Sequence, residues 1–125
     1  MPKYQTYKDL EIYRTSHKLA VEIHRFTLEL PKYEQYEIGS QLRRSSKSVS
    51  ANIVEGFGRK RYIADYIRFL IFAMASNNET IEWIEYIRDC HQNFSGRAEH
   101  LIEELNILGR KLNRFIASID QSRNQ

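Results

Sequence analysis

The sequence predicts an all-α fold, an antiparallel up-down-up-down four-helix bundle in which residues 1–125 form a single domain. Apolar residues recur at steps of three and four along four segments, and this spacing is typical of one helix face. Glycine and proline are scarce, with 5 and 2 residues, whereas an all-β fold needs many turns. The connections between the segments are short, so consecutive helices are expected to be antiparallel neighbours.

The first helix is expected over residues 9–30 and the second over residues 35–57. Pro31 ends the first helix because its ring removes a backbone donor, and residues 32–36 are expected to form a short linker. The second helix is stopped or loosened by two glycines at its C-terminal end. The residues expected to point inward are Ile12, Ser16, Leu19, Ile23, Phe26 and Leu30 on the first helix, and Ile38, Leu42, Ser45, Val49, Ile53 and Gly56 on the second.

The third helix is expected over residues 62–91 and the fourth over residues 97–119. Residues 93–96 separate them, with Ser95 as the N-cap, and the polar tail, residues 120–125, is expected to fray. The inward faces are expected to carry Tyr66, Leu70, Ala73, Asn77, Ile81, Ile84 and Ile87 on the third helix, and Leu101, Leu105, Leu108, Leu112, Phe115 and Ile119 on the fourth.

Composition excludes several classes of protein. The one cysteine, Cys90, rules out an internal disulfide framework and fits a reducing compartment. The longest apolar run, residues 69–75, is too short to span a bilayer, and the first residues lack the apolar region of a secretory signal. We therefore expect a cytoplasmic protein with no membrane partner.

Charge is distributed unevenly along the chain, although the net charge is only +3. Basic residues cluster around Glu55, and acidic residues dominate between positions 79 and 104. These faces are either simply solvated, or complementary poles for self-association, or a basic surface for RNA or DNA. No sequence-reading motif is present, so nucleic-acid binding would depend on the phosphate backbone. The candidate phosphate-contacting residues are Arg43, Arg44, Lys47, Arg59, Lys60 and Arg61.

A polar stripe follows one flank of the second helix, where Ser48, Asn52 and Glu55 continue the line begun by Arg44. Such a stripe is typical of a polar seam that fixes the register of two helices, and it is also compatible with half of a binding site. A lone carboxylate without a second carboxylate or base does not indicate catalysis. We predict no enzymatic activity and no catalytic residues.

Metal, cofactor and nucleotide motifs are also missing. No histidine has a glutamate three residues before it, as di-iron bundles require, so no metal site and no cofactor are expected. The Gly-Phe-Gly-Arg-Lys sequence at residues 56–60 lacks the spacing of a phosphate loop. The helix that begins just beyond it, together with the basic residues 59–61, would nevertheless suit phosphate oxygens.

The third helix is more apolar than a monomeric bundle requires. Its outward positions include aliphatic and aromatic side chains, and Trp and Tyr are residue types enriched in the cores of protein interfaces. We therefore predict a homo-oligomer, whereas the alternative is a few singly exposed apolar residues, which are common. The candidate interface residues are Ile71, Phe72, Trp83 and Tyr86 on the third helix, and Val54 on the second.

Three segments resemble a known family. They are RSSKSVSANIVEGFGR at residues 44–59, YKDLEIY at residues 7–13, and FLIFAMASNNET at residues 69–80. Together they resemble the bacterial four-helix-bundle family named for proteins encoded in 23S rRNA intervening sequences. The family often has Gly-Ser where this chain has Ser76 and Asn77.

The resemblance implies a bundle that assembles into a ring-shaped homopentamer. The related accessory variability determinant proteins of diversity-generating retroelements form basic pentameric barrels that bind nucleic acid and a reverse transcriptase. Family members otherwise lack a firm biochemical function, so the resemblance leaves the physiological role unknown.

Residues and resemblance together favour a non-enzymatic oligomeric bundle that acts as a nucleic-acid-binding or scaffold module. The alternative is a protein–protein interaction or assembly module that binds no nucleic acid. An RNA-cleaving helical enzyme is disfavoured, because each arginine that precedes a histidine is too close to it for the usual motif of helical ribonucleases.

Overall fold

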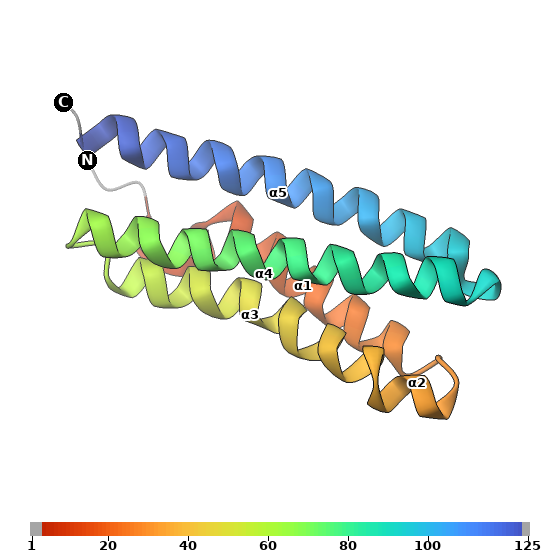
Figure 1. The fold of residues 1–125 in the computed structure, drawn as a ribbon. Helices are drawn as coiled ribbons and strands as arrows, with labels where there is room; N and C mark the ends of the chain where they lie inside the picture. Colours follow the sequence, from red (N-terminus) through yellow and green to blue (C-terminus); the bar gives the residue numbers. More distant parts are fainter. Residues whose placement is uncertain (1–3, 124–125) are drawn as a thin grey trace.

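The computed structural model describes residues 4–123, which fold into an antiparallel bundle of four long helices (Figure 1). The predicted four-helix bundle is confirmed, and the described residues contain no strand. The long helices are α1 (Glu11–Thr27), α3 (Ile38–Gly58), α4 (Ile63–Cys90) and α5 (Ser95–Arg123). The short elements are the 3-10 helices η1 (Tyr7–Asp9) and η2 (Gln92–Phe94) and the single-turn helix α2 (Lys32–Tyr36).

The helices surround the core in the order α1, α3, α4, α5. α3 packs against both α1 and α4, and α4 packs against both α3 and α5, while α1 and α5 touch much less (Figure 1). α3 therefore has two flanks, one facing α4 and one facing α1. This arrangement places the predicted site residues of α3 on different surfaces of the bundle.

The core is built from the inward faces of all four helices. Its fully buried side chains include Phe26, Leu42, Ile84 and Leu108. Four predicted inward residues are partly buried and pack against the core, namely Ile38, Ile81, Phe115 and Ile119. Thr80, which was not predicted to point inward, is fully buried. The polar Thr80 is accommodated because its hydroxyl donates to the backbone carbonyl of Ser76 at 2.7 Å.

The ends of the helices differ from the expected ranges. The expected linker at residues 32–36 is the helix α2, whose N-cap is Pro31, and the Pro31 carbonyl accepts from the backbone N–H groups of Glu34 and Gln35. α5 begins at Ser95, which has helical dihedrals of φ −60° and ψ −39°, and continues to Arg123, past the expected end at residue 119. Residues 120–123 of the tail, which was expected to fray, are helical, and residues 124–125 lie outside the described part.

No helix within residues 4–123 has an apolar stretch long enough to cross a lipid bilayer.

Candidate nucleic-acid interface

The six predicted phosphate contacts lie along α3 and its exit turn, but they do not form one patch. Arg43 is half-buried and faces α1 and α2, where it donates to Thr27 Oγ1 at 2.7 Å and to the carbonyl of Gln35 at 2.8 Å. Arg44 lies on the opposite flank and pairs with Glu79 of α4 at 3.1 Å. Both arginines therefore already have partners within the chain.

Arg59 is also engaged. Its guanidinium lies 3.0 Å from Glu55 and 3.7 Å from Asp65, and it sits 4.8 Å from the centre of the Phe69 ring. Asp65, in the first turn of α4, has a second partner in Arg68 at 3.3 Å. The local charge around Arg59 is therefore balanced by carboxylates.

Lys60 and Arg61 form what we call the basic corner, in the turn between α3 and α4. Both side chains are exposed, and neither has an ion pair within the described part of the chain. They line a surface hollow of about 500 Å³ that also reaches Ile119 near the end of α5. The Lys60 ammonium lies 4.1 Å from the centre of the Phe57 ring, so it is held at the surface rather than extended at random.

Lys47 is the third predicted cation without an ion pair within residues 4–123. It is exposed on the flank of α3 that faces α1, where it lines a groove with His17, His24 and Arg25. Burial lowers the pKa of His24, and the nearby cations Lys47, Arg43 and Arg25 lower it further. This groove could not be predicted from the sequence, because its two walls come from different helices.

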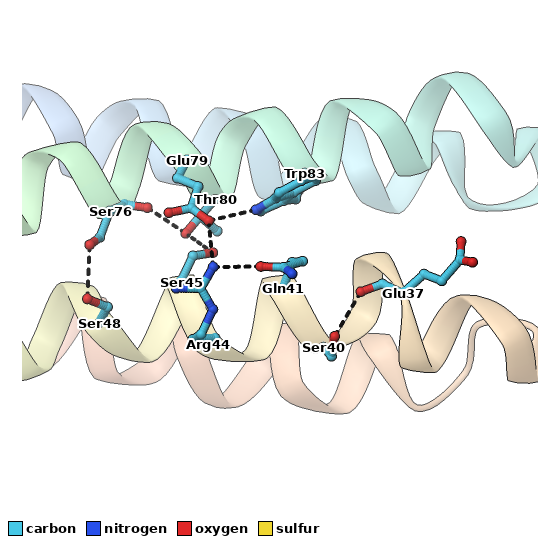
Figure 2. A network of polar contacts seen from close by, with 10 residues as sticks. All are labelled: Glu37, Ser40, Gln41, Arg44, Ser45, Ser48, Ser76, Glu79, Thr80 and Trp83. Carbon is cyan, nitrogen blue, oxygen red and sulfur yellow. Dashed lines mark hydrogen bonds and ion pairs between the residues drawn. The ribbon is translucent and has the colours of Figure 1, made fainter.

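The polar seam lies between α3 and α4 (Figure 2). The Ser76 hydroxyl donates to Ser48 Oγ at 3.0 Å, and Asn52 Nδ2 donates to the same Ser48 oxygen at 3.0 Å. Of the three predicted seam residues, the structure brings Ser48 and Asn52 together. Glu55 lies one turn further along α3 and pairs with Arg59.

A second hydroxyl pair in this seam was not predicted from the sequence. Thr80 Oγ1 lies 2.9 Å from Ser45 Oγ, and both residues are buried (Figure 2). The signal that could have found it is the presence of small hydroxyl residues at helical spacing on both α3 and α4. Because these hydroxyls bond to one another inside the bundle, the buried part of the seam has a structural role.

Trp83, a predicted interface residue, is only half-exposed and packs against the core. Its indole Nε1 donates to Glu79 Oε2 at 2.9 Å, and Arg44 donates to the same oxygen (Figure 2). Val54 is likewise half-buried. By contrast, Ile71 and Phe72 are 51% and 44% exposed on the outer face of α4.

A buried carboxylate was not anticipated from the sequence. Glu34 of α2 is only 4% exposed, and its Oε2 lies 2.6 Å from His91 Nε2 at the end of α4. The backbone N–H of Ile38 donates to the other carboxylate oxygen at 3.4 Å. The contact spans 57 positions in the sequence, so no local pattern indicates it. The pair fixes the α2 turn against the far end of α4.

The described residues contain no group of three or more histidine, cysteine, aspartate or glutamate side chains that could hold a metal ion.

Comparison with known proteins agrees with the four-helix bundle fold. The family model of 23S rRNA-intervening sequence proteins matches residues 8–114. A crystal structure of a protein of unknown function from the S23 ribosomal protein family of Bacteroides thetaiotaomicron superposes with a TM-score of 0.76. The two sequences are 23% identical over 85% of this chain and 95% of that chain, a likeness that bears on the fold alone. No curated protein matches the chain significantly.

Proposed function

This chain belongs to the family of 23S rRNA-intervening sequence proteins, and on that premise we propose that it is a non-enzymatic bundle that binds the phosphate backbone of RNA or DNA. The family has no established biochemical function, so the proposal depends on the chain's own charges. The basic corner is the observation that carries it. Lys60 and Arg61 are exposed, lack an ion pair within residues 4–123, and border a hollow of about 500 Å³.

The corner also lies where a long helix begins. Backbone N–H groups at the start of α4 carry partial positive charge, which favours phosphate oxygens. Asp65, the acidic residue of that first turn, is paired with Arg59 and Arg68 and so opposes an incoming phosphate less than a free carboxylate would. Contacts of this kind position a nucleic acid without reading its sequence.

The test is the binding of RNA and DNA across a salt series. A double variant, Lys60→Ala with Arg61→Ala, is compared with the matched double variant Arg110→Ala with Arg114→Ala, which removes two exposed cations from α5. Loss of two phosphate contacts is expected to lower the slope of log affinity against log salt by about 1.4–1.8, depending on strand type. The control variant should keep nearly the full slope.

Two results would count against the proposal. If the protein binds neither RNA nor DNA at about 50 mM salt, where backbone contacts are strong, nucleic-acid binding is excluded. If the slope is the same in the corner variant and in the wild type, the basic corner is not the contact surface.

A second function, assembly without nucleic acid, is favoured by the outer face of α4. Ile71, Phe72 and Tyr86 are 51%, 44% and 47% exposed, and such residues are typical of interface cores. Glu82 and Glu85, on the acidic half of α4, have no ion pair in the described part of the chain. Charge complementarity between this half and the basic α3 of another copy would set the register of a homo-oligomer. A ring-shaped homopentamer is the assembly we propose.

A further inference from the structure

We propose that the groove between α1 and α3 is a binding track for single-stranded nucleic acid, with cations contacting phosphates and the His17 ring stacking on an unpaired base. This inference rests on the proposed nucleic-acid function, and it adds a second surface and a strand type to it. The groove has a volume of about 490 Å³. Its polar lining consists of His17, His24, Arg25, Lys47 and Ser50.

Charges on α1 are segregated in a way that leaves the groove free of carboxylates. Glu11 is paired with Lys111 of α5 at 2.9 Å. Glu22 lines a different hollow, together with Arg97 of α5. Glu29, just after α1, is also directed to α5 and pairs with Arg97 at 2.7 Å. The acidic groups of this part of the chain therefore face α5, whereas Arg25 and the imidazoles face α3.

The electrostatic effect of this segregation is visible at His24. Burial lowers its pKa, and the cations Lys47, Arg43 and Arg25 lower it further. Two of these cations line the groove, Arg25 from α1 and Lys47 from α3, whereas Arg43 of α3 is not among its lining residues. A phosphate placed between them would meet a positive field with no carboxylate to oppose it.

Two tyrosine rings, Tyr7 of η1 and Tyr13 of α1, pack against the core beside His17 without lining the groove themselves. The Tyr7 and Tyr13 rings are 4.9 Å apart with an interplanar angle of 76°. The Tyr13 and His17 rings are 5.7 Å apart, and Tyr13 Oη lies 3.5 Å from His17 Nδ1. His17 is exposed and lines the groove, so it is the ring most available to a base.

Cations beside stacking rings favour a single strand over a duplex. Unpaired bases can stack on aromatic side chains, whereas the bases of a duplex are already stacked and paired. A basic surface without such rings would bind both forms through the backbone alone. The juxtaposition of Lys47 and Arg25 with His17 therefore selects the single strand.

The experiment uses the full chain and a fluorescent RNA of about 15 nucleotides, a length that covers a typical single-strand site. Anisotropy is measured over a salt series at constant pH, with the RNA either single-stranded or annealed to its complement. Four substitutions at exposed positions are compared: Lys47→Ala, Lys47→Arg, His17→Ala and, as the matched control on α5, Arg110→Ala. Circular dichroism melting verifies that each variant is folded.

The expected results separate the two kinds of contact. The wild type should bind the single strand at least about fivefold more tightly than the duplex, since one stacked base contributes that much. Lys47→Ala should lower the salt slope by about 0.7, the effect of one lost phosphate contact, and Lys47→Arg should restore it. His17→Ala should weaken binding about fivefold or more, with the slope unchanged. Arg110→Ala should change neither quantity.

The outcomes distinguish this inference from the proposed function. If wild-type protein binds but Lys47→Ala and His17→Ala behave like Arg110→Ala, while the basic-corner variant loses affinity, the groove is excluded and the proposed function stands. A duplex bound as tightly as the single strand would overturn the strand assignment. No binding of either form would overturn both proposals, and would leave an acidic protein segment as the partner to test next.

Discussion

The environment of each charged residue decides how much it contributes to the stability of the fold. Two glutamates close together in the sequence illustrate this. Glu34 is buried and lies 2.6 Å from His91, whereas Glu29 is exposed and pairs with Arg97 at 2.7 Å. Water screens the exposed pair and can replace its partners, so its net contribution is small. Water cannot replace the partner of the buried carboxylate.

Removing the histidine should therefore destabilise the fold. We expect His91→Ala to lower the free energy of unfolding by about 3 kcal/mol, because the Glu34 carboxylate stays buried without its imidazole partner. Urea denaturation followed by circular dichroism measures the change. Arg97→Ala is the comparison, since it breaks an exposed ion pair of similar length, and it should cost clearly less. Equal losses of unfolding free energy in the two variants would show that the Glu34–His91 contact stabilises the fold no more than an exposed ion pair does.

The lowered pKa of His24 predicts how the stability of the fold depends on pH. Its pKa is lowered from the ordinary value of 6.5 by burial and then by Lys47, Arg43 and Arg25. The unfolded chain therefore takes up this proton more readily than the folded one, and the His24 contribution to stability should decrease as pH falls below about 6.5. We expect Lys47→Ala to raise the pKa of His24, as measured by NMR titration of its ring protons. An unchanged pKa would mean that Lys47 does not act on the groove.

At the scale of helices, close approach of α3 to α4 depends on small residues. The hydroxyls of Ser45 and Ser48 meet Thr80 and Ser76 across the interface. Further along, Gly56 lies against α4, where an added Cβ would be 3.1 Å from Phe69 Cβ and 3.3 Å from the backbone oxygen of Tyr66. The backbone oxygen cannot move aside without shifting α4 itself.

Two glycines in the same helix provide a matched test of this packing. Gly56→Ala should lower the free energy of unfolding by about 1–3 kcal/mol, the usual cost of overpacking. Gly58→Ala should be neutral or raise it by up to about 1 kcal/mol, because a Cβ there meets nothing within 4 Å and the unfolded chain loses freedom. Thermal and urea unfolding of both variants measure the difference. If both substitutions change the free energy of unfolding equally, the contact at Gly56 does not limit how closely α3 approaches α4.

The helices could be predicted from the sequence because their signal is local. A repeat of three and four placed Ile23, Leu42 and Leu108 on inward faces, and all three are buried. The segments at residues 44–59, 7–13 and 69–80 together predicted the family, which the match over residues 8–114 confirms. One-turn helix α2 was missed, because five residues contain too little repeat to distinguish a helix from a linker.

Contacts between helices could not be predicted in the same way. Arg43 and Arg44 were both predicted to contact phosphate. Side chains at neighbouring positions on a helix, however, point about 100° apart. One therefore contacts Thr27 and the other Glu79. The α1–α3 groove and the Glu34–His91 pair were missed for the same reason, since each depends on how two separate helices are packed. Whether the predicted phosphate contacts bind a ligand stays a prediction.

At the scale of the whole molecule, the bundle has two surfaces with different chemistry. Cations without ion pairs in the described part of the chain, Lys47, Lys60 and Arg61, lie along α3 and its exit turn. Exposed Ile71 and Phe72 lie on the outer face of α4. A ring whose contacts bury the outer face of α4 but leave Lys47, Lys60 and Arg61 uncovered would present several copies of the basic surface together. Multiple weak phosphate contacts would then act on one nucleic acid, which increases the overall affinity.

This arrangement predicts that self-association depends on the apolar face of α4. We expect the wild type to show a multiple of the 14.9 kDa chain mass in light scattering at micromolar concentration. Phe72→Arg should shift the mass toward a single chain, because a charge would be buried in the interface core. The matched control is Leu28→Arg, since Leu28 is 55% exposed but lies outside α4, and it should leave the mass unchanged. A monomeric wild type would contradict the assembly, and equal effects of the two variants would place the interface elsewhere.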